Sequence, residues 1–588
     1  AGQGRGMRLA LIGLALIGHV SSFLPSPLIG RATPISLRHR AHCRLSMVAS
    51  KPADGSERKR APDQKVTLRD IRASEQHLRD TTMGTCIDSI EALFQRCTEE
   101  VPSTRIKHES STLPQDLPGG ALIRVGPNPR PESDIKAFFD GDGMIHVCTI
   151  PPPERRGEHE MYYSRQWVRG KGFSKEEEEG ECLFEGTLVA PEGWPMLTAM
   201  YNNVVKAGQP VKDTANTAIS SHGGKILARM EQCCPTELSV STKAEVKTVE
   251  AATSLGGSIP YDPLTGGALA AHAKQDTATG ESMSFTYNTF PPGVRYDVRT
   301  QDGQLAHSTM IGLPCPIMLH DLAITDKYSV LMDLPLTLKP QKAIFNSFPV
   351  SFEKDLPSRI GLVPRYGDES GTLWFDIETC VVLHTINAFE RGDGTVVVRG
   401  FRYLPTGPHS FLCEYNPAFP YEWVLDLKSG KCIQEGYTSS TAGEFPCMHP
   451  DYIGKPSKYV YGVSPTGLDG PVTTYSAPRS STLYGKIVKY DMDAGGVASA
   501  YDFPERNFVV SETTVVPKLK ASGTKEDECY LLCITSETQG DRRVPYGSKL
   551  QVFDGADLSK GPVASVPLPH DVPYGLHSDY VPWDQLTQ

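Results

Sequence analysis

Histidines are the residues of this sequence best suited to carry chemistry. The chain has no HExxH, GxSxG, Walker or GxGxxG pattern, which removes the common motif-defined hydrolases and nucleotide enzymes. Four of the sixteen histidines lie in apolar surroundings, where the ring nitrogens need partners. Taken singly, each is more often a satisfied core residue than a metal ligand. The four are His272 in LAAHAKQD, His320 in CPIMLHDLAIT, His384 in CVVLHTINAF and His577 in VPYGLHSDYVP.

Short strands must position these side chains, because β patterning dominates the sequence from Leu117 onward. Apolar or alternating runs lie between turns rich in Gly, Pro and Asp, and helical stretches are few. The predicted strands are 121–125, 144–150, 225–230, 328–334, 380–386, 395–401, 486–492, 530–535 and 549–554. Many strands without a break in composition predict one closed all-β domain. A β-propeller protects its sheet edges by radial repetition, and a sandwich or multi-barrel assembly stays open on the pattern alone.

The first 60 residues have the composition of a targeting presequence. Residues 1–53 contain no Asp or Glu, and Met7-Arg8 precedes the short apolar run LALIGLALIG. An Arg- and Ser-rich segment follows it, as in a transit peptide. A signal peptide followed by a transit peptide resembles the two-part presequence of algae with secondary plastids. We therefore expect a plastid (chloroplast) protein, with a secreted protein or signal anchor as the alternative.

Two segments outside the strands receive structural predictions. Residues 61–105 are predicted to form an N-terminal helical arm, because apolar residues between 66 and 100 recur at three- and four-residue spacings. The apolar segment 195–205 is predicted to pack in the core or to touch a membrane surface peripherally. The acidic run Glu176 to Glu179 is expected to be a solvated loop.

The composition is that of a soluble globular protein in a reducing compartment. The hydrophobic fraction is 39%, the charged fraction 22% and the net charge −10. The dispersed Lys and Arg residues predict no nucleic-acid partner. Fourteen scattered cysteines in a long chain indicate free thiols and not a disulfide framework.

Several long motifs, in order, resemble the carotenoid cleavage dioxygenases across nearly all of residues 106–588. The motifs are RVGPNPRP (124–131), FFDGDGMIH (138–146), YDPLTGGALAAHAKQDTATGE (261–281), MLHDLAITDKYSVLMDLPL (318–336), VVLHTINAFERGDGTVVV (381–398) and PVASVPLPHDVPYGLHSDYVP (562–582). The resemblance implies a seven-bladed β-propeller over 106–588, with a helical and loop cap over the iron-bearing face. It also implies one Fe(2+) on the propeller axis, bound by His272, His320, His384 and His577.

The resemblance further implies residues that support the iron site. Three glutamates should accept the second N–H of ligand histidines, and they map to Glu231 in ILARMEQ, Glu444 in TAGEFP and Glu512 in VVSETTVVP. Surface glutamates are the alternative, strongest for Glu512 because Ser511 and Thr513 flank it where the family has Gly and Pro. Thr217 in DTANTAIS is a possible neighbour of the open coordination position. Asp579, after the fourth ligand, is either a local hydrogen-bond partner or exposed.

The implied activity is oxidative cleavage of a conjugated carbon–carbon double bond by O2. A carotenoid or apocarotenoid would yield two carbonyl fragments, with no nicotinamide or flavin required. Within the family, stilbene cleavage and retinoid or carotenoid isomerisation are alternatives. A non-catalytic propeller that binds a lipid or a partner protein is the alternative from another class.

Overall fold

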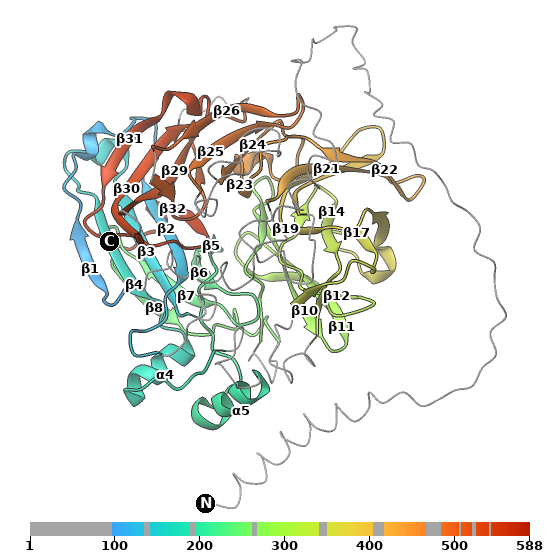
Figure 1. Ribbon diagram of the computed structural model, residues 1–588, viewed down its shortest axis with the longest axis horizontal. Coiled ribbons are helices and arrows are strands. Elements are labelled where there is room, and N and C mark those ends of the chain that lie inside the picture. Colours follow the sequence, from blue (N-terminus) through green and yellow to red (C-terminus); the bar gives the residue numbers. More distant parts are fainter. Residues whose placement is uncertain are drawn as a thin grey trace, which may run out of the picture. The chain divides into compact units, whose positions relative to one another are not determined.

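The structure is a computed structural model that describes residues 97–133, 141–186, 196–260, 267–339, 350–403, 417–465, 484–504, 507–519, 525–539 and 542–588. All of these residues belong to one compact unit, Pro62–Gln588. The described part consists of antiparallel sheets arranged around a central axis, with α4 (Lys171–Glu179) and α5 (Met196–Ala207) as its two α-helices (Figure 1).

Seven sheets of four or five strands form the blades of a β-propeller. In hydrogen-bonded order, the first blade consists of β1 (Val101–Arg105), β4 (Tyr162–Trp167), β3 (Gly143–Ile150), β2 (Gly120–Pro127) and β32 (Ser578–Pro582). The second blade consists of β5 (Ala218–His222), β6 (Lys225–Arg229), β7 (Thr236–Val240) and β8 (Val246–Glu250). The third consists of β12 (Leu305–Gly312), β11 (Pro292–Arg299), β10 (Glu281–Thr289) and β9 (Lys274–Asp276), and the fourth of β13 (Ala323–Ile324), β14 (Tyr328–Asp333), β17 (Ser358–Pro364) and β18 (Leu373–Ile377).

The other three blades complete the ring. The fifth blade consists of β19 (Val381–Glu390), β20 (Thr395–Tyr403), β21 (Phe419–Asp426) and β22 (Lys431–Tyr437). The sixth consists of β23 (Glu444–Cys447), β24 (Tyr459–Ser464), β25 (Lys486–Asp491) and β26 (Val497–Asp502). The seventh consists of β27 (Asn507–Val509), β28 (Thr514–Pro517), β29 (Cys529–Gln539), β30 (Arg542–Asp554) and β31 (Pro562–Pro567). A two-stranded ribbon, β15 (Leu336–Leu338) with β16 (Val350–Phe352), is inserted in the fourth blade. The predicted seven-bladed propeller is therefore confirmed, and all nine predicted strands are present.

Burial changes from the axis to the rim of each blade. In the fifth blade, every residue of the second strand, β20, is buried, whereas the outermost strand, β22, is largely exposed. The run Thr395-Val396-Val397-Val398 in β20 is β-branched throughout, which suits a strand packed on both faces. Apolar clusters join neighbouring blades, so that the core is a ring of sheet-on-sheet contacts.

The chain closes this ring with its last strand. β32 pairs antiparallel with β2, and Val581 faces Ala121, both fully buried. Strands from the two ends of the domain thus share the first blade, which closes the ring of blades.

The strands nearest the axis are β5, β9, β13, β19, β23, β28 and β32. Neighbouring pairs around the axis, such as β9 with β13 and β13 with β19, are in contact. Most of the candidate site residues stand at or just before the first residues of these strands, and His384 lies inside β19; the others are Thr217, His272, His320, Glu444, Glu512 and His577. The propeller thus gathers residues that lie up to several hundred positions apart into one layer.

The predicted helical arm is wrong at its C-terminal end. Residues 101–105 form strand β1, which pairs with β4 at the outer edge of the first blade. Pro102 is tolerated there because an edge strand does not need every backbone N–H. The propeller therefore begins at Val101 and not at 106. Residues 97–100 are also not helical, and the rest of the arm, 61–96, lies outside the described residues together with the presequence 1–60.

The acidic run is helical and not a loop, although Glu177, Glu178 and Glu179 are exposed as predicted. Glu176 to Glu179 form the last turn of α4, and the Glu176 side chain is buried. Its carboxylate lies 2.6 Å from the Lys212 ammonium, which also lies 2.6 Å from Asp142. Asp213 accepts the first backbone N–H groups of α4, a favourable place for a carboxylate. Glu176 is therefore buried because it forms an ion pair with Lys212, which is distant in sequence.

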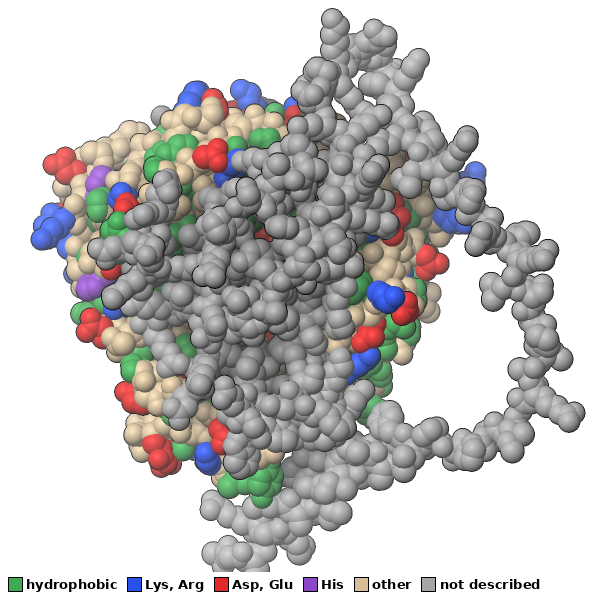
Figure 2. All heavy atoms as spheres, in the orientation of Figure 1, with side chains coloured by type: hydrophobic (Ala, Val, Ile, Leu, Met, Phe, Trp, Pro, Cys, Tyr) green, Lys and Arg blue, Asp and Glu red, His purple; other side chains and the backbone are tan. Residues whose placement is uncertain are grey.

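The apolar segment 195–205 is helical where it is described. In α5, Ala199 is buried, while Tyr201 and Val205 are 64% and 57% exposed. Figure 2 shows apolar side chains gathered at the edge of the molecule where Figure 1 places α5. One face of the helix therefore packs and the other presents apolar surface. No helix among the described residues is long and apolar enough to cross a membrane.

Candidate metal centre

The four predicted histidines come together on the propeller axis. One ring nitrogen from each lies within 4.8 Å of the others. The Nε2 atom of His320 is 3.2 Å from the Nε2 atoms of both His272 and His384. The rings of His272 and His577 are 4.5 Å apart between centroids and nearly perpendicular. Sequence positions spanning 306 residues thus form one cluster of imidazoles.

Local backbone features direct these rings toward the axis. His272, His320 and His577 lie just ahead of β9, β13 and β32, where the chain enters the inner layer. His384 lies inside β19, at an irregularity in its pairing with β20: Val382 faces Arg402, but Thr385 faces Gly400. A bulge of this kind turns a side chain out of the regular alternation of a strand.

The three predicted glutamates contact three of the histidines at Nδ1. Glu444 lies 2.5 Å from Nδ1 of His384, and Glu512 lies 2.9 Å from Nδ1 of His577. Glu231 makes a close ion-pair contact with Nδ1 of His320, at an angle that is poor for a hydrogen bond. Each glutamate thus pairs with one histidine, including Glu512, whose flanking residues differ from the motif.

Further donors hold the second oxygens of these carboxylates. Tyr403 donates its hydroxyl to Glu444 at 2.7 Å, and the backbone N–H of Ser578 donates to Glu512 at 2.7 Å. Burial alone would raise the pKa of Glu444, but the electrostatic interaction with His384 and the hydrogen bonds from His384, Phe445 and Tyr403 hold this pKa below its ordinary value. Glu444 is therefore an anion in the folded protein.

This pairing decides which ring nitrogens face the axis. A carboxylate only accepts hydrogen bonds, so each paired Nδ1 carries the proton and each Nε2 carries a lone pair. The Nε2 lone pairs of His320 and His384 then face each other at 3.2 Å. Burial and the neighbouring imidazoles hold the pKa of His272 well below its ordinary value. A cation at the centre satisfies all four nitrogens, and imidazole is a common ligand of iron and other transition metals.

Phe445 is a site residue whose conformation the sequence did not reveal. It lies in the left-handed region, with φ of 52°, and its ring centroid is 5.3 Å from that of His384 and 5.1 Å from that of His577. A strained non-glycine residue at such a point is typical of functional sites. The only sequence signal was its place beside Glu444 in the EFP motif.

Thr217 lies next to the cluster. Its carbonyl accepts the backbone N–H of His577 at 3.3 Å, and its hydroxyl donates to Asn216 at 2.9 Å. Asn216 in turn donates to the carbonyl of Gly141, in the FFDGDGMIH motif. Thr217 is therefore beside the fourth histidine, and its expected place facing the open coordination position stays a prediction.

The carboxylate of Asp579 forms hydrogen bonds with a residue of β5 and not with His577. Its carboxylate accepts the backbone N–H and the hydroxyl of Ser221, at 2.9 and 3.0 Å. Burial raises the pKa of Asp579, although these hydrogen bonds oppose the shift. Asp579 thus ties β32 to β5.

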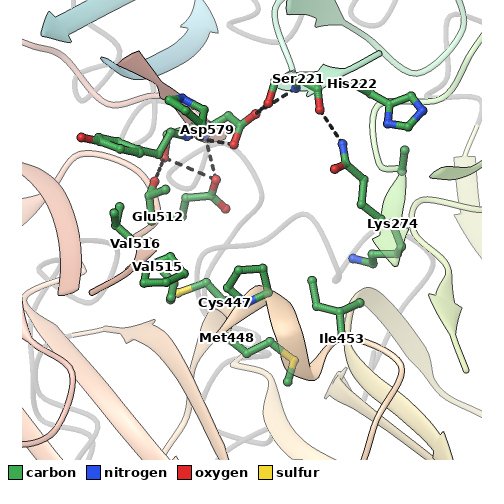
Figure 3. A pocket seen from close by; sticks show the side chains of 18 of the residues that line it. Ser221, His222, Lys274, Cys447, Met448, Ile453, Glu512, Val515, Val516 and Asp579 are labelled. Carbon is green, nitrogen blue, oxygen red and sulfur yellow. Dashed lines mark hydrogen bonds between the residues drawn. The ribbon is translucent and has the colours of Figure 1, made fainter. Parts of the chain in front are cut away.

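A cavity of about 910 Å³ adjoins the cluster along the axis. All seven blades line it, through residues that follow the site residues along the inner strands. Figure 3 shows Glu512 and Asp579 on one side of this cavity and Lys274 on the other. Polar side chains thus face the axis immediately beyond the histidines.

This propeller is similar to known carotenoid oxygenases in sequence and in fold. The family model described as retinal pigment epithelial membrane protein matches residues 94–582, and the chain belongs to this carotenoid oxygenase family. Carotenoid 9,10(9′,10′)-cleavage dioxygenase 1 of Phaseolus vulgaris is 31% identical over 518 residues, covering 83% of this chain and 88% of the relative. The rice 9-cis-epoxycarotenoid dioxygenase NCED1, chloroplastic, is 27% identical, covering 83% and 75%.

Solved structures share the fold. Cobalt-substituted Synechocystis ACO has a TM-score of 0.69 and 24% identity, covering 84% of this chain and 99% of that one. A lignostilbene dioxygenase of Pseudomonas brassicacearum has a TM-score of 0.68 and 23% identity, covering 84% and 97%. At these identities the likeness establishes the propeller.

Replacing Glu444 with Gln should weaken metal binding. The amide keeps the shape but removes the charge that fixes the protonation of His384, and loss of such a partner typically costs about 10–100-fold in metal affinity. Titration of the metal-free chain with Co²⁺ measures this. Glu422→Gln is the matched control, because Glu422 accepts from Arg399 at 2.8 Å away from the histidines. Equal affinities for the two variants would contradict the expectation.

Proposed function

We propose that the chain is a non-haem iron dioxygenase that cleaves a conjugated double bond of a carotenoid or apocarotenoid with O2. The observation that carries the proposal is the convergence of imidazole lone pairs forced by the glutamates at Nδ1. Membership of the carotenoid oxygenase family supports it.

In this proposal His272, His320, His384 and His577 hold Fe(2+), and they are the catalytic residues. Iron bound there would supply the activation of O2. Both oxygen atoms enter the products, one on each carbon of the cleaved bond, so that no external reductant is needed. Four neutral imidazoles leave the ion's double positive charge intact, because the three carboxylates bind the histidines and not the metal.

The protein's own contribution is to orient the ligands and to place the substrate. Glu231, Glu444 and Glu512 fix the protonation and direction of three rings. Thr217, beside His577, is proposed to face the open coordination position. Placement of one double bond decides the product, because a polyene offers many similar bonds.

A carotenoid is favoured over the alternative substrates. The relatives that are at least 30% identical are named as carotenoid 9,10(9′,10′)-cleavage dioxygenases, which makes those bonds the first to assay. The lignostilbene dioxygenase is 23% identical to this chain, and at that identity the likeness concerns the fold alone. Stilbene cleavage and isomerisation remain outcomes that product analysis distinguishes, and a non-catalytic propeller would bind no iron.

His320→Ala and His384→Ala should each abolish iron binding and cleavage while leaving a folded chain. Each removes a ligand from the proposed centre but leaves the blades intact. Iron per chain and the masses of aldehydes from a carotenoid and stilbene panel are the measurements. His307→Ala, which alters a histidine on β12 bonded to the carbonyl of Gly367, is the control. Full iron content and turnover in either ligand variant would overturn the assignment.

We also propose that α5 contacts a membrane peripherally. Tyr201 and Val205 are exposed, and an apolar polyene must be collected from lipid. The double variant Tyr201→Ser, Val205→Ser should bind phosphatidylcholine vesicles at least about tenfold less in sedimentation, since burying each side chain is worth about 1.5–3 kcal/mol. The matched control is Val249→Ser with Ile433→Ser, which are 58% and 57% exposed on β8 and β22. An equal loss in both would refute a role for α5.

The proposed compartment is the plastid. The presequence composition of residues 1–60 and the chloroplastic NCED relatives support it. A fluorescent protein fused after residues 1–60 should enter plastids of an alga with secondary plastids, because a signal peptide followed by a transit peptide is predicted there. The matched fusion with Arg31, Arg38 and Arg40 replaced by Glu should not enter. Secretion of the first fusion would favour the signal-anchor or secreted alternative.

A further inference from the structure

A buried carboxylate outside the glutamate set connects three of the histidine-bearing segments. Asp321 directly follows His320 and is 4% exposed. Its Oδ2 atom accepts from the Lys274 ammonium at 2.9 Å, the Thr385 backbone N–H at 2.9 Å and the Thr385 hydroxyl at 2.8 Å. Its Oδ1 atom accepts the backbone N–H of Leu322 at 2.8 Å. Every partner is a donor, so the carboxylate is fully satisfied where it is buried.

The partners of Asp321 belong to different blades. Lys274 lies two residues after His272 in β9, and Thr385 lies one residue after His384 in β19. β9, β13 and β19 belong to three separate sheets, so no backbone ladder fixes their relative positions. Side-chain contacts must set the spacing of the histidines that these strands carry. Asp321 provides such a contact between all three.

His272 depends most on this contact. The other three histidines each have a glutamate at Nδ1, whereas among the described residues no carboxylate contacts Nδ1 of His272. β9, the strand that follows it, is only three residues long. The ion pair of Lys274 with Asp321 therefore holds the segment whose ring is least held by its own partners.

We propose that Asp321 is a positioning residue that, with Lys274 as its counter-ion, sets the spacing of His272, His320 and His384. The inference rests on the proposed metal site and deepens it. It assigns to one carboxylate the role of joining three ligand segments on the side of the axial cavity. A metal ion would then find ring nitrogens that folding has already brought close together.

The test compares Asp321→Asn, Lys274→Met and Thr385→Val in the full chain. Lys274 faces the axial cavity, so that Met fits there without overpacking (Figure 3). Thr385→Val removes only the hydroxyl and keeps the backbone N–H. Asp333→Asn is the matched control, because Asp333 is a 9% exposed acid of the same blade that accepts from Arg359 at 2.7 Å. Lys274→Arg is the conservative variant.

Metal-free protein is titrated with Co²⁺, and affinity and the visible cobalt spectrum are recorded with the unfolding midpoint. We expect Asp321→Asn and Lys274→Met to bind about 10–100-fold more weakly, with a changed cobalt spectrum. Asp333→Asn should lower the unfolding midpoint but leave affinity and spectrum as in the wild type. Lys274→Arg should bind as the wild type does.

Four outcomes would overturn the inference or separate it from the proposed function. Wild-type affinity and spectrum in Asp321→Asn overturn the positioning role alone, as does an equal loss of affinity in Asp333→Asn. If Asp321→Asn does not fold, unchanged binding in Lys274→Met and Thr385→Val overturns it. A wild-type chain that binds no Co²⁺ and no Fe²⁺ overturns the proposed function itself.

Discussion

The pairing of carboxylates with imidazole Nδ1 atoms is the constraint on which the centre of this molecule depends. Once Glu444 and Glu512 accept from His384 and His577, the Nε2 lone pairs can only face the axis. Lone pairs that face one another repel in the absence of a cation, so a metal ion bound between them would stabilise the folded protein. The glutamates would thereby stabilise such an ion without binding it, because they contact the histidines at Nδ1.

The propeller meets this constraint through its topology. Inner strands begin in one layer, so each blade can contribute a residue at that level while its outer strands supply the packing. Closure by β32 on β2 brings His577 to the axis beside residues more than three hundred positions earlier. Because blades meet through side chains and not through backbone ladders, hydrogen bonds such as Asp321 to Thr385 and Asp579 to Ser221 must hold the inner layer together.

The sequence contained the ligands and the fold class, but not the contacts between segments. The four histidines and three glutamates stand in long local motifs, and the strands have clear β patterning, so both were predictable. The helical arm was wrong at 101–105 because strand formation there depends on pairing with β4. The predicted exposure of Glu176 was wrong because its ion-pair partner, Lys212, lies 36 residues further along the chain. Asp321 escaped notice because Lys274 and Thr385 are 47 and 64 residues away from it.

The four histidines are therefore not equivalent, although each offers the same nitrogen. Three are oriented by a glutamate at Nδ1, and His272 is oriented by the backbone that leads into β9. Because His272 has no such partner, the position of its backbone segment determines the direction of its ring. The ion pair between Lys274 and Asp321 holds that segment. Lys274 lines the axial cavity, and its partner Asp321 is buried beside it. Control of the metal site thus extends from the rings, through one carboxylate, to the cavity wall.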